Sequence, residues 1–322
     1  MQRLKTLIIP FKDQRTPWLD DIIALVKPRH DIALLDKHKP LAPQFKGVQV
    51  VIDQGGWGTR EMIEAAVDAR LWQIVGTGFD HFDLAYCKTK KIPICNCPGQ
   101  FSSIPLAETA MMFILMLSRQ FRRSENNFFS KVLYEPLGRE LCGLKLGIIG
   151  LGASGIELAL RAKPFGLSIL GIDIRRPPAE VLKRFEPEFI GAPDALDQVI
   201  SQSDFVSLHL HLNEKTRHII DARRIALMKP DACLINVARG QLVDETALYR
   251  ALSEGKIGGA GLDVFTTEPP DSTLPVYRLP NVVVTPHIAA MTNGTSRRRA
   301  ECTAQNIDRV AQGQEPLYRV DQ

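Results

Sequence analysis

The sequence predicts an α/β protein built on parallel, doubly wound sheets, and three observations lead to that prediction. Short apolar runs alternate with helical stretches along most of the 322 residues. The apolar runs are largely continuous, which is typical of parallel strands that helices cover on both faces. A glycine-rich turn at 150–155 joins one of these runs directly to a helix.

The first part of the chain is predicted to be a small α/β unit with a helix at 61–70. Its expected strands are 6–9, 31–35, 48–52, 73–75 and 92–96. A long helix near 105–119 follows. It contains Glu108 and falls short of the roughly 18 uninterrupted apolar residues of a membrane span, so we expect a buried helix.

A second α/β series follows a polar, less regular stretch at 121–143. Its expected strands are 146–150, 168–173, 205–210, 233–238, 259–265 and 281–287. Asp244 is the predicted N-cap of a helix that ends near Gly255. The last helix, at about 294–312, leads into an apolar tail at 316–320, which we expect to return to the first domain.

Composition excludes several classes of protein. With 45% hydrophobic and 24% charged residues the chain is globular, and a net charge of +4 gives no reason to expect a nucleic-acid or membrane partner. The three arginines at 297–299 spread around a helix rather than forming a stripe. The start is too polar for a signal peptide, and no two of the six cysteines form C-x-x-C, so we expect a cytoplasmic protein without a metal.

The glycine-rich turn predicts a dinucleotide site of the Rossmann type. Gly150 permits the tight turn, Gly152 the approach of a pyrophosphate, and Gly155 the close packing of helix and strand. Asp173 ends the next strand, 173 − 152 = 21 residues after the middle glycine, and is suited to bind ribose hydroxyls. This favours NAD over NADP, with the following arginines, at 175–176, interpreted as solvated loop charges.

The carboxyl ends of the later strands carry the candidate catalytic residues. Arg239 follows one strand, Asp263 lies late in the next, and His287 ends the last. Reduction of a ketone needs a proton donor and a cation that holds the carboxylate, which His287 and Arg239 supply. Glu268 is the candidate carboxylate that stabilises the imidazolium.

Each of these residues also has a structural interpretation when it is taken alone. His287 is compatible with a hydrogen-bonded core histidine, Arg239 with a surface ion pair, and Glu268 with a solvated loop. For each residue taken alone, the sequence does not decide between the structural and the catalytic interpretation.

At these residues the chain resembles the D-isomer-specific 2-hydroxyacid dehydrogenase family over nearly its whole length. The most specific stretches are 138–155, 203–220, 228–248, 261–270 and 279–289. The resemblance implies that Arg239 binds substrate, that His287 is the general acid/base and that Glu268 is its partner. It places Asp263 at the nicotinamide side of the cofactor.

The resemblance also implies the domain organisation. Residues 1–103 and 294–322 would form a discontinuous, flavodoxin-like substrate domain, and residues 104–293 the NAD-binding Rossmann domain. The loop 75–83 would hold the substrate carboxylate near Thr77 and Gly78, and the helix at 104–118 would belong to a homodimer interface. The implied cofactor contacts are Gly150, Gly152, Ala153, Ser154, Gly155, Asp173, His209, Val237, Ala238 and Asp263.

Three departures from the family pattern lie outside the catalytic set, namely Ser154, His211 and Thr109. The expected reaction is hydride transfer between NAD(H) and a small 2-hydroxy or 2-oxo acid of the glyoxylate, hydroxypyruvate or D-lactate type. D-3-Phosphoglycerate is an alternative, disfavoured because the stretch 52–59 has no basic residue. A second alternative is a non-catalytic NAD(H) sensor that resembles corepressors with this fold.

Overall fold

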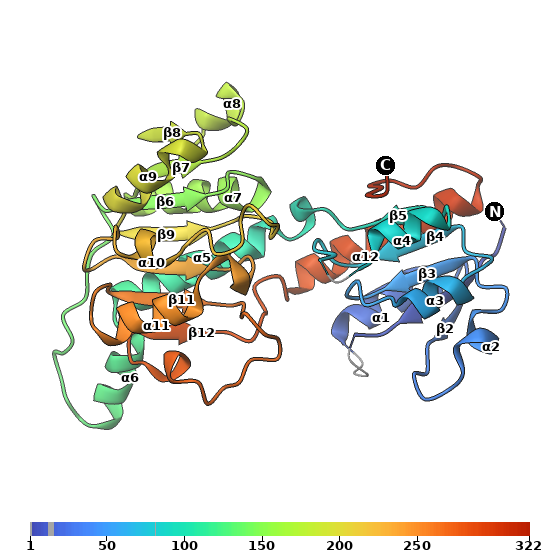
Figure 1. Ribbon diagram of the computed structural model, residues 1–322, viewed down its shortest axis with the longest axis horizontal. Coiled ribbons are helices and arrows are strands. Elements are labelled where there is room, and N and C mark those ends of the chain that lie inside the picture. Colours follow the sequence, from blue (N-terminus) through green and yellow to red (C-terminus); the bar gives the residue numbers. More distant parts are fainter. Residues whose placement is uncertain (1, 12–15, 81) are drawn as a thin grey trace. The chain divides into compact units, whose positions relative to one another are not determined.

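The computed structural model describes residues 2–11, 16–80 and 82–322 and consists of two compact units (Figure 1). Unit 1 comprises Met1–Ser102 and Met291–Gln322, and unit 2 comprises Ser103–Ala290. The predicted domain boundaries, after 103 and after 293, lie one and three residues beyond Ser102 and Ala290.

Unit 1 contains a five-stranded parallel sheet in the order β2-β1-β3-β4-β5. Its strands are β1 (Lys5–Ile9), β2 (Asp31–Leu34), β3 (Val50–Asp53), β4 (Leu71–Ile74) and β5 (Ile94–Cys95). Its α-helices are α1 (Pro17–Val26), α2 (Leu41–Phe45), α3 (Arg60–Ala65), α4 (Leu84–Thr89) and α12 (Asn293–Ala311). The short helix η1 (Gly99–Phe101) follows β5.

The C-terminal part of the chain completes unit 1. Buried residues of α12, including Ala300 and Ile307, share a core cluster with β1, β3 and α1. The tail then runs back to the sheet, where Arg319 forms a bridge with Cys95, and the N–H of Val320 donates to Ile94 at 2.9 Å. The prediction that the tail 316–320 returns to the first domain is confirmed.

Unit 2 contains a seven-stranded parallel sheet in the order β12-β11-β10-β9-β6-β7-β8. The strands are β6 (Lys145–Ile149), β7 (Ser168–Ile172), β8 (Phe189–Gly191), β9 (Phe205–Leu208), β10 (Cys233–Asn236), β11 (Gly259–Leu262) and β12 (Val282–Val284). The α-helices are α5 (Ser103–Ser118), α6 (Phe121–Phe129), α7 (Ala153–Ala162), α8 (Ala179–Leu182), α9 (Leu196–Gln202), α10 (Ala222–Ile225) and α11 (Glu245–Ser253). Short helices lie at η2 (Lys163–Phe165), η3 (Pro193–Ala195), η4 (Gly240–Leu242) and η5 (Pro275–Arg278).

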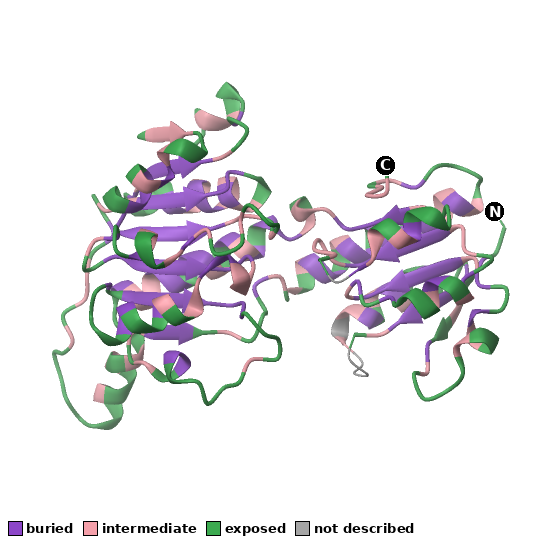
Figure 2. Ribbon diagram, viewed as in Figure 1, coloured by how far each residue is buried: buried purple, intermediate pink, exposed green. Residues whose placement is uncertain are grey.

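Apart from the half-buried edge strand β8, the strands of the unit 2 sheet are largely buried, as the purple ribbons in Figure 2 show. Successive residues of a strand point to opposite faces. Accordingly Val206 and Leu234 belong to one core cluster, while Phe205 and Ile235 belong to the other. The predicted doubly wound parallel sheet is confirmed.

The strand order predicts where a ligand binds in unit 2. From β6 the chain adds β7 and β8 on one side, and it then returns to add β9, β10, β11 and β12 on the other. In such sheets ligands bind at the carboxyl ends of the strands, where the order reverses. The ends of β6 and β9 meet there, and the later strands deliver their carboxyl ends to the same edge.

Capping residues explain where α11 begins and ends. The carboxylate of Asp244 accepts a hydrogen bond from the N–H of Ala247 at 3.0 Å, and Gly255 has a φ of +65° after α11, so the predicted cap and helix end are confirmed. The predicted helix at 61–70 is shorter in the structure, where α3 ends at Ala65.

Several short elements were not predicted, and α6 and β8 show why. α6 lies in the stretch 121–143, which the sequence analysis treats as irregular because polar residues fill most of it. β8 is a half-buried edge strand of only three residues, too short to be recognised as a strand from its sequence.

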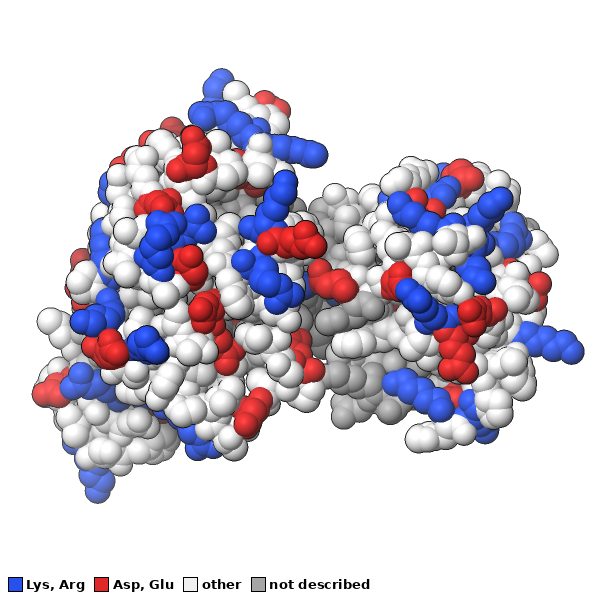
Figure 3. All heavy atoms as spheres, in the orientation of Figure 1, with Lys and Arg blue, Asp and Glu red and all other residues white. Residues whose placement is uncertain are grey.

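The surface carries mixed charge. Figure 3 shows acidic and basic side chains interspersed on the visible face of each unit. Several form ion pairs in unit 2, such as Arg223 with Asp197 at 2.6 Å and Lys229 with Asp204 at 3.2 Å. Within the described chain no helix is both long enough and apolar enough to cross a membrane.

Candidate active site

The glycine-rich turn connects β6 to α7 and has the backbone that the sequence predicts. Gly150 has a φ of +101°, and a Cβ there would lie 2.5 Å from the carbonyl oxygen of His209. A Cβ at Gly155 would lie 2.0 Å from the oxygen of Gly150, so helix and turn approach as closely as glycine allows. A Cβ at Gly152 would instead meet nothing within 4 Å.

The start of α7 has the features of an anion site. Gly152 is the N-cap and supplies no side-chain hydrogen bond to the first turn of the helix. The N–H groups of that turn therefore remain available, and the helix dipole adds positive potential. Together with the open space beside Gly152, this geometry fits the pyrophosphate of a dinucleotide.

Asp173 follows β7 and lies beside the glycine-rich turn. Its Oδ2 accepts a hydrogen bond from the N–H of Leu151 at 2.6 Å, and its Oδ1 accepts one from the N–H of Arg175 at 2.9 Å. The carboxylate thus shapes the turn, and its remaining lone pairs leave capacity for ribose hydroxyls. Arg175 and Arg176 are exposed, and Arg176 donates to the oxygen of Ile190 at 3.3 Å.

The predicted cofactor residues after β9 and β10 lie in different environments. His209 bridges Ser207 and Ser154, with 3.0 Å from a ring nitrogen to each hydroxyl oxygen. Val237 and Ala238 have buried side chains in the two core clusters of unit 2. A cofactor contact at these two positions therefore involves the backbone.

Arg239 lies in a tight turn after β10 that Asn236 organises. The Asn236 side chain accepts from the N–H of Ala238 at 3.1 Å and donates to the oxygen of Arg239 at 2.8 Å. A Cβ at Gly240 would lie 1.9 Å from the carbonyl carbon of Phe265, so glycine lets this turn approach the loop after β11. Arg239 itself donates from Nη1 to the oxygen of Ala238 at 2.7 Å.

His287 and Glu268 form a hydrogen-bonded pair. The distance from His287 Nδ1 to Glu268 Oε2 is 2.7 Å, and the other carboxylate oxygen accepts from the N–H of Phe265 at 3.2 Å. Nearly half of the His287 side chain, 47%, is exposed. Because Nδ1 is hydrogen-bonded to the carboxylate, Nε2 is the nitrogen available to a substrate.

The surroundings of Glu268 favour its charged form. Burial acts to raise the pKa of Glu268, but the hydrogen bond and positive charge of His287, with the charge of Arg239, hold that pKa below its ordinary value. Glu268 is therefore suited to stabilise a protonated imidazole. The contribution of Arg239 to this lowering places its charge within electrostatic range of Glu268.

Asp263 holds the loop that carries His287. Its Oδ1 accepts from the hydroxyl of Thr285 at 2.6 Å and from the N–H of Ile288 at 2.8 Å, and its Oδ2 accepts from the N–H of Ala289 at 2.9 Å. Within this clamp His287 has a φ of +55°, a region that few non-glycine residues occupy. Burial raises the pKa of Asp263, and the donated hydrogen bonds oppose that shift.

The predicted substrate loop belongs to unit 1. The oxygen of Thr77 accepts from the side-chain amide of Asn96 at 2.9 Å, and its hydroxyl lies 3.4 Å from that of Ser102. Gly78 follows directly, and the N–H of Cys97 donates to the oxygen of Gly76 at 3.0 Å. His81, within the predicted loop 75–83, lies outside the described residues.

The sequence analysis missed three residues that shape the site. These are Asn236, Thr285 and Ser207, which position the residues predicted to react or to bind. All three are polar residues within or directly after otherwise apolar strand-like runs. That contrast is the signal by which such positioning residues are found.

Comparisons with known proteins agree with this geometry. Residues 111–289 match the family model described as D-isomer specific 2-hydroxyacid dehydrogenase, NAD binding domain. The chain is similar to a D-lactate dehydrogenase from Aquifex aeolicus, solved with NAD and lactic acid, with a TM-score of 0.84 and 28% identity over 98% of this chain and 99% of that one.

Two sequence relatives point to the same family. A glyoxylate reductase from Korarchaeum cryptofilum is 37% identical over 81% of this chain and 79% of its own length. A D-3-phosphoglycerate dehydrogenase from Methanocaldococcus jannaschii is 38% identical over 85% of this chain, but the match spans only 52% of that protein. The chain thus belongs to the D-isomer specific 2-hydroxyacid dehydrogenase family of NAD-dependent oxidoreductases.

Proposed function

We propose that this protein interconverts a small D-2-hydroxy acid and its 2-oxo acid, with glyoxylate and hydroxypyruvate as the leading substrates. The observation that carries the proposal is the His287–Glu268 pair, with one ring nitrogen bonded to the carboxylate and the side chain half exposed. A histidine held in this way is suited to exchange a proton with a substrate oxygen.

In the direction of reduction, His287 gives a proton to the oxygen of the carbonyl group as that oxygen gains negative charge. The Glu268 carboxylate stabilises the protonated imidazole before the transfer and fixes the orientation of the ring. In the direction of oxidation the same nitrogen accepts the hydroxyl proton. The nicotinamide, when bound, supplies or accepts the hydride.

Arg239 is the proposed anchor for the substrate carboxylate. A guanidinium grips a carboxylate with two parallel hydrogen bonds, and its charge polarises the neighbouring carbonyl group. Asn236 fixes the turn that presents it. The backbone near Thr77 and Gly78 is the proposed second contact of the carboxylate.

We propose a preference for NAD over NADP. Asp173 lies beside the glycine-rich turn, where its negative charge would repel a 2′-phosphate, and the side chains of Arg175 and Arg176 are exposed. A higher kcat/KM with NADPH than with NADH would contradict this preference.

The first test is NADH oxidation by the purified protein against glyoxylate, hydroxypyruvate, pyruvate, longer 2-oxo acids and 3-phosphohydroxypyruvate. His287→Ala should lower kcat by about 10²- to 10⁴-fold, since it removes the proton donor. Arg239→Lys should mainly raise KM, because lysine keeps the charge but not the paired hydrogen bonds. Arg223→Ala is the matched control, because Arg223 forms an exposed ion pair with Asp197.

Turnover of a small oxo acid, with a lower kcat in His287→Ala and a higher KM in Arg239→Lys, would support the proposal. Full activity in His287→Ala would refute the assigned acid/base. Tight NADH binding without turnover of any oxo acid would instead favour the sensor function that the sequence leaves open.

A phosphorylated substrate is the second candidate, because the chain resembles a D-3-phosphoglycerate dehydrogenase. The turn after β3, residues 54–58, reads QGGWG and offers no cation to a phosphate. We therefore expect a lower kcat/KM for 3-phosphohydroxypyruvate than for glyoxylate.

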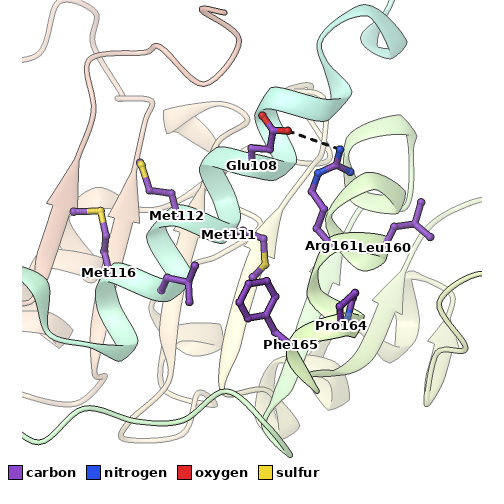
Figure 4. A pocket seen from close by; sticks show the side chains of 9 residues that line it. Glu108, Met111, Met112, Met116, Leu160, Arg161, Pro164 and Phe165 are labelled. Carbon is purple, nitrogen blue, oxygen red and sulfur yellow. Dashed lines mark ion pairs between the residues drawn. The ribbon is translucent and has the colours of Figure 1, made fainter.

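We also propose that the protein is a cytoplasmic homodimer formed through unit 2. A groove of about 630 Å³ lies between α5 and α7, and apart from the Glu108–Arg161 pair at 3.9 Å its lining is apolar (Figure 4). Its lining residues include Met111, Met112 and Phe165. Further apolar side chains, each at least 70% exposed, lie on and after α6, namely Phe128, Phe129, Leu133, Tyr134 and Leu137.

Such a concentration of exposed apolar surface marks an interface, and a second copy of the chain presents the same surfaces by symmetry. Light scattering should give a mass near 2 × 35.9 = 71.8 kDa. The double variant Met112→Lys, Phe165→Lys should be monomeric, whereas Val67→Lys, at an isolated exposed apolar residue of unit 1, should not change the mass. A wild-type mass of 35.9 kDa would refute the dimer.

A further inference from the structure

A chain of three polar side chains runs from the interior of the unit 2 sheet to the start of α7. Ser207 lies in β9 and is fully buried, and its hydroxyl oxygen is 3.0 Å from Nε2 of His209. Nδ1 of the same ring is 3.0 Å from the hydroxyl oxygen of Ser154, the second residue of α7. Ser154 is half-buried beside the exposed Gly152 and Ala153.

His209 is neutral in this chain. Burial lowers the pKa of His209 to about 4, and no carboxylate contributes to that shift. A neutral imidazole has one N–H donor and one acceptor nitrogen. The two serine hydroxyls therefore play opposite roles toward the ring, and only two arrangements of the protons are possible.

The burial of Ser207 selects between these arrangements. If Nε2 carried the proton and donated to Ser207, the hydroxyl proton of Ser207 would need another acceptor, and none occurs among the described residues. An unsatisfied buried hydroxyl is costly. When Ser207 donates to Nε2, that cost disappears, and Nδ1–H donates to Ser154.

This order of protons leaves the hydroxyl proton of Ser154 directed away from the ring. We propose that the Ser207–His209–Ser154 relay makes Ser154 a dedicated hydrogen-bond donor to the cofactor's pyrophosphate. Ser154 then adds a side-chain donor to the N–H groups at the start of α7, and Ser207 acts as a positioning residue that never touches the cofactor. The inference rests on the NAD site of the proposed function and assigns a role to residues inside it.

The relay predicts a specific pattern of NADH affinities. Ser154→Ala should raise the Kd for NADH about tenfold or more, the effect of losing one hydrogen bond to a charged group. Ser207→Ala should weaken binding several-fold, because Ser154 can then donate inward to Nδ1. The double variant should bind no more weakly than Ser154→Ala, since both substitutions remove the same donor.

The experiment is a fluorescence titration of NADH with the full-length protein, repeated by competition with ADP, which retains two phosphates but lacks the nicotinamide. Ser154→Thr keeps the hydroxyl and should retain most of the affinity. Ser201→Ala is the control, because that hydroxyl bonds only within α9. Nitrogen NMR of the His209 ring gives an independent readout, with the proton expected on Nδ1 in the wild type and this preference weakened in Ser207→Ala.

Wild-type affinity in Ser154→Ala, or a proton on Nε2 of the wild-type ring, would overturn the relay. Additive losses of NADH affinity in the double variant would show that Ser207 does not act through the relay. If the wild-type protein itself failed to bind NADH, the proposed function would be wrong, and this outcome is separate from a failure of the relay.

Discussion

At the residue scale, Arg299 is a buried cation with no acidic partner among the described residues. It is 5% exposed on α12, its guanidinium lies 5.3 Å from the ring centre of Trp18, and its Nε has no hydrogen-bond partner within the described chain. Burial lowers the pKa of Arg299, which shows that its surroundings oppose the charge. Even buried ion pairs, whose charges attract each other, can often be replaced by apolar side chains of similar size at no cost or with a gain of about 1–4 kcal/mol.

Arg299→Met is therefore expected to raise the free energy of unfolding by about 1–3 kcal/mol, measured by urea denaturation. The matched control is Arg298→Met, which should not stabilise the protein, because Arg298 donates to the oxygen of Phe101 at 2.9 Å. A destabilised Arg299→Met variant would show that the interaction with Trp18 outweighs the cost of burial.

His209 gives the protein a predicted dependence of stability on pH. Its folded-state pKa of about 4 lies below the ordinary value of 6.5, so between these values the unfolded chain binds a proton that the folded chain does not. The contribution of His209 to stability is complete above pH 6.5 and is lost as the pH falls toward 4. From pH 7 to pH 5 the loss amounts to about 2 kcal/mol.

Urea denaturation at pH 7 and pH 5 tests this dependence. His209→Asn should lose about 2 kcal/mol less than the wild type over that interval, whereas His38→Asn, at an exposed loop position, should follow the wild type. Parallel curves for wild type and His209→Asn would show that the histidine titrates alike in both states.

At the scale of elements, the end of β11 fixes the loop that carries His287. Asp263→Asn should lower kcat and destabilise the fold by about 1–3 kcal/mol, because an amide group cannot accept both backbone hydrogen bonds, from Ile288 and Ala289, on separate oxygens. Asp271→Asn, in an exposed turn, is the control. The resemblance placed Asp263 at the nicotinamide, and a raised Kd for NADH with unchanged kcat would favour that role over the clamp.

The sequence predicts elements where residue type and spacing follow from a local cause. Gly150 and Gly155 are required by close approach, and Asp244 by its cap, so their positions could be predicted without a structure. β8 and α6 lack such signals. Asn236 and Thr285 act on backbone and side chains of neighbouring turns, and only the folded loops show which groups they hold.

At the scale of the whole molecule, the two units differ in how the chain builds them. Unit 2 is one continuous segment, Ser103–Ala290, with a core cluster on each face of its sheet. Unit 1 needs both ends of the chain, since Ala300, Ala304, Ile307 and Val310 of α12 complete its core. Strand periodicity predicts each sheet, but it carries no information about which distant helix closes unit 1.

This difference predicts which fragments of the chain fold on their own. A fragment of residues 103–290 should unfold cooperatively in urea and bind NADH, because its core and the glycine-rich turn are complete. A fragment of residues 1–102 should remain largely unfolded, since without α12 one face of its sheet exposes Leu4, Ile8 and Val50 to water. Joining residues 291–322 to it through a flexible linker should restore cooperative unfolding, and the same linker followed by a polar sequence of equal length is the control. Cooperative unfolding of 1–102 alone would show that α12 packs on a unit that is already stable.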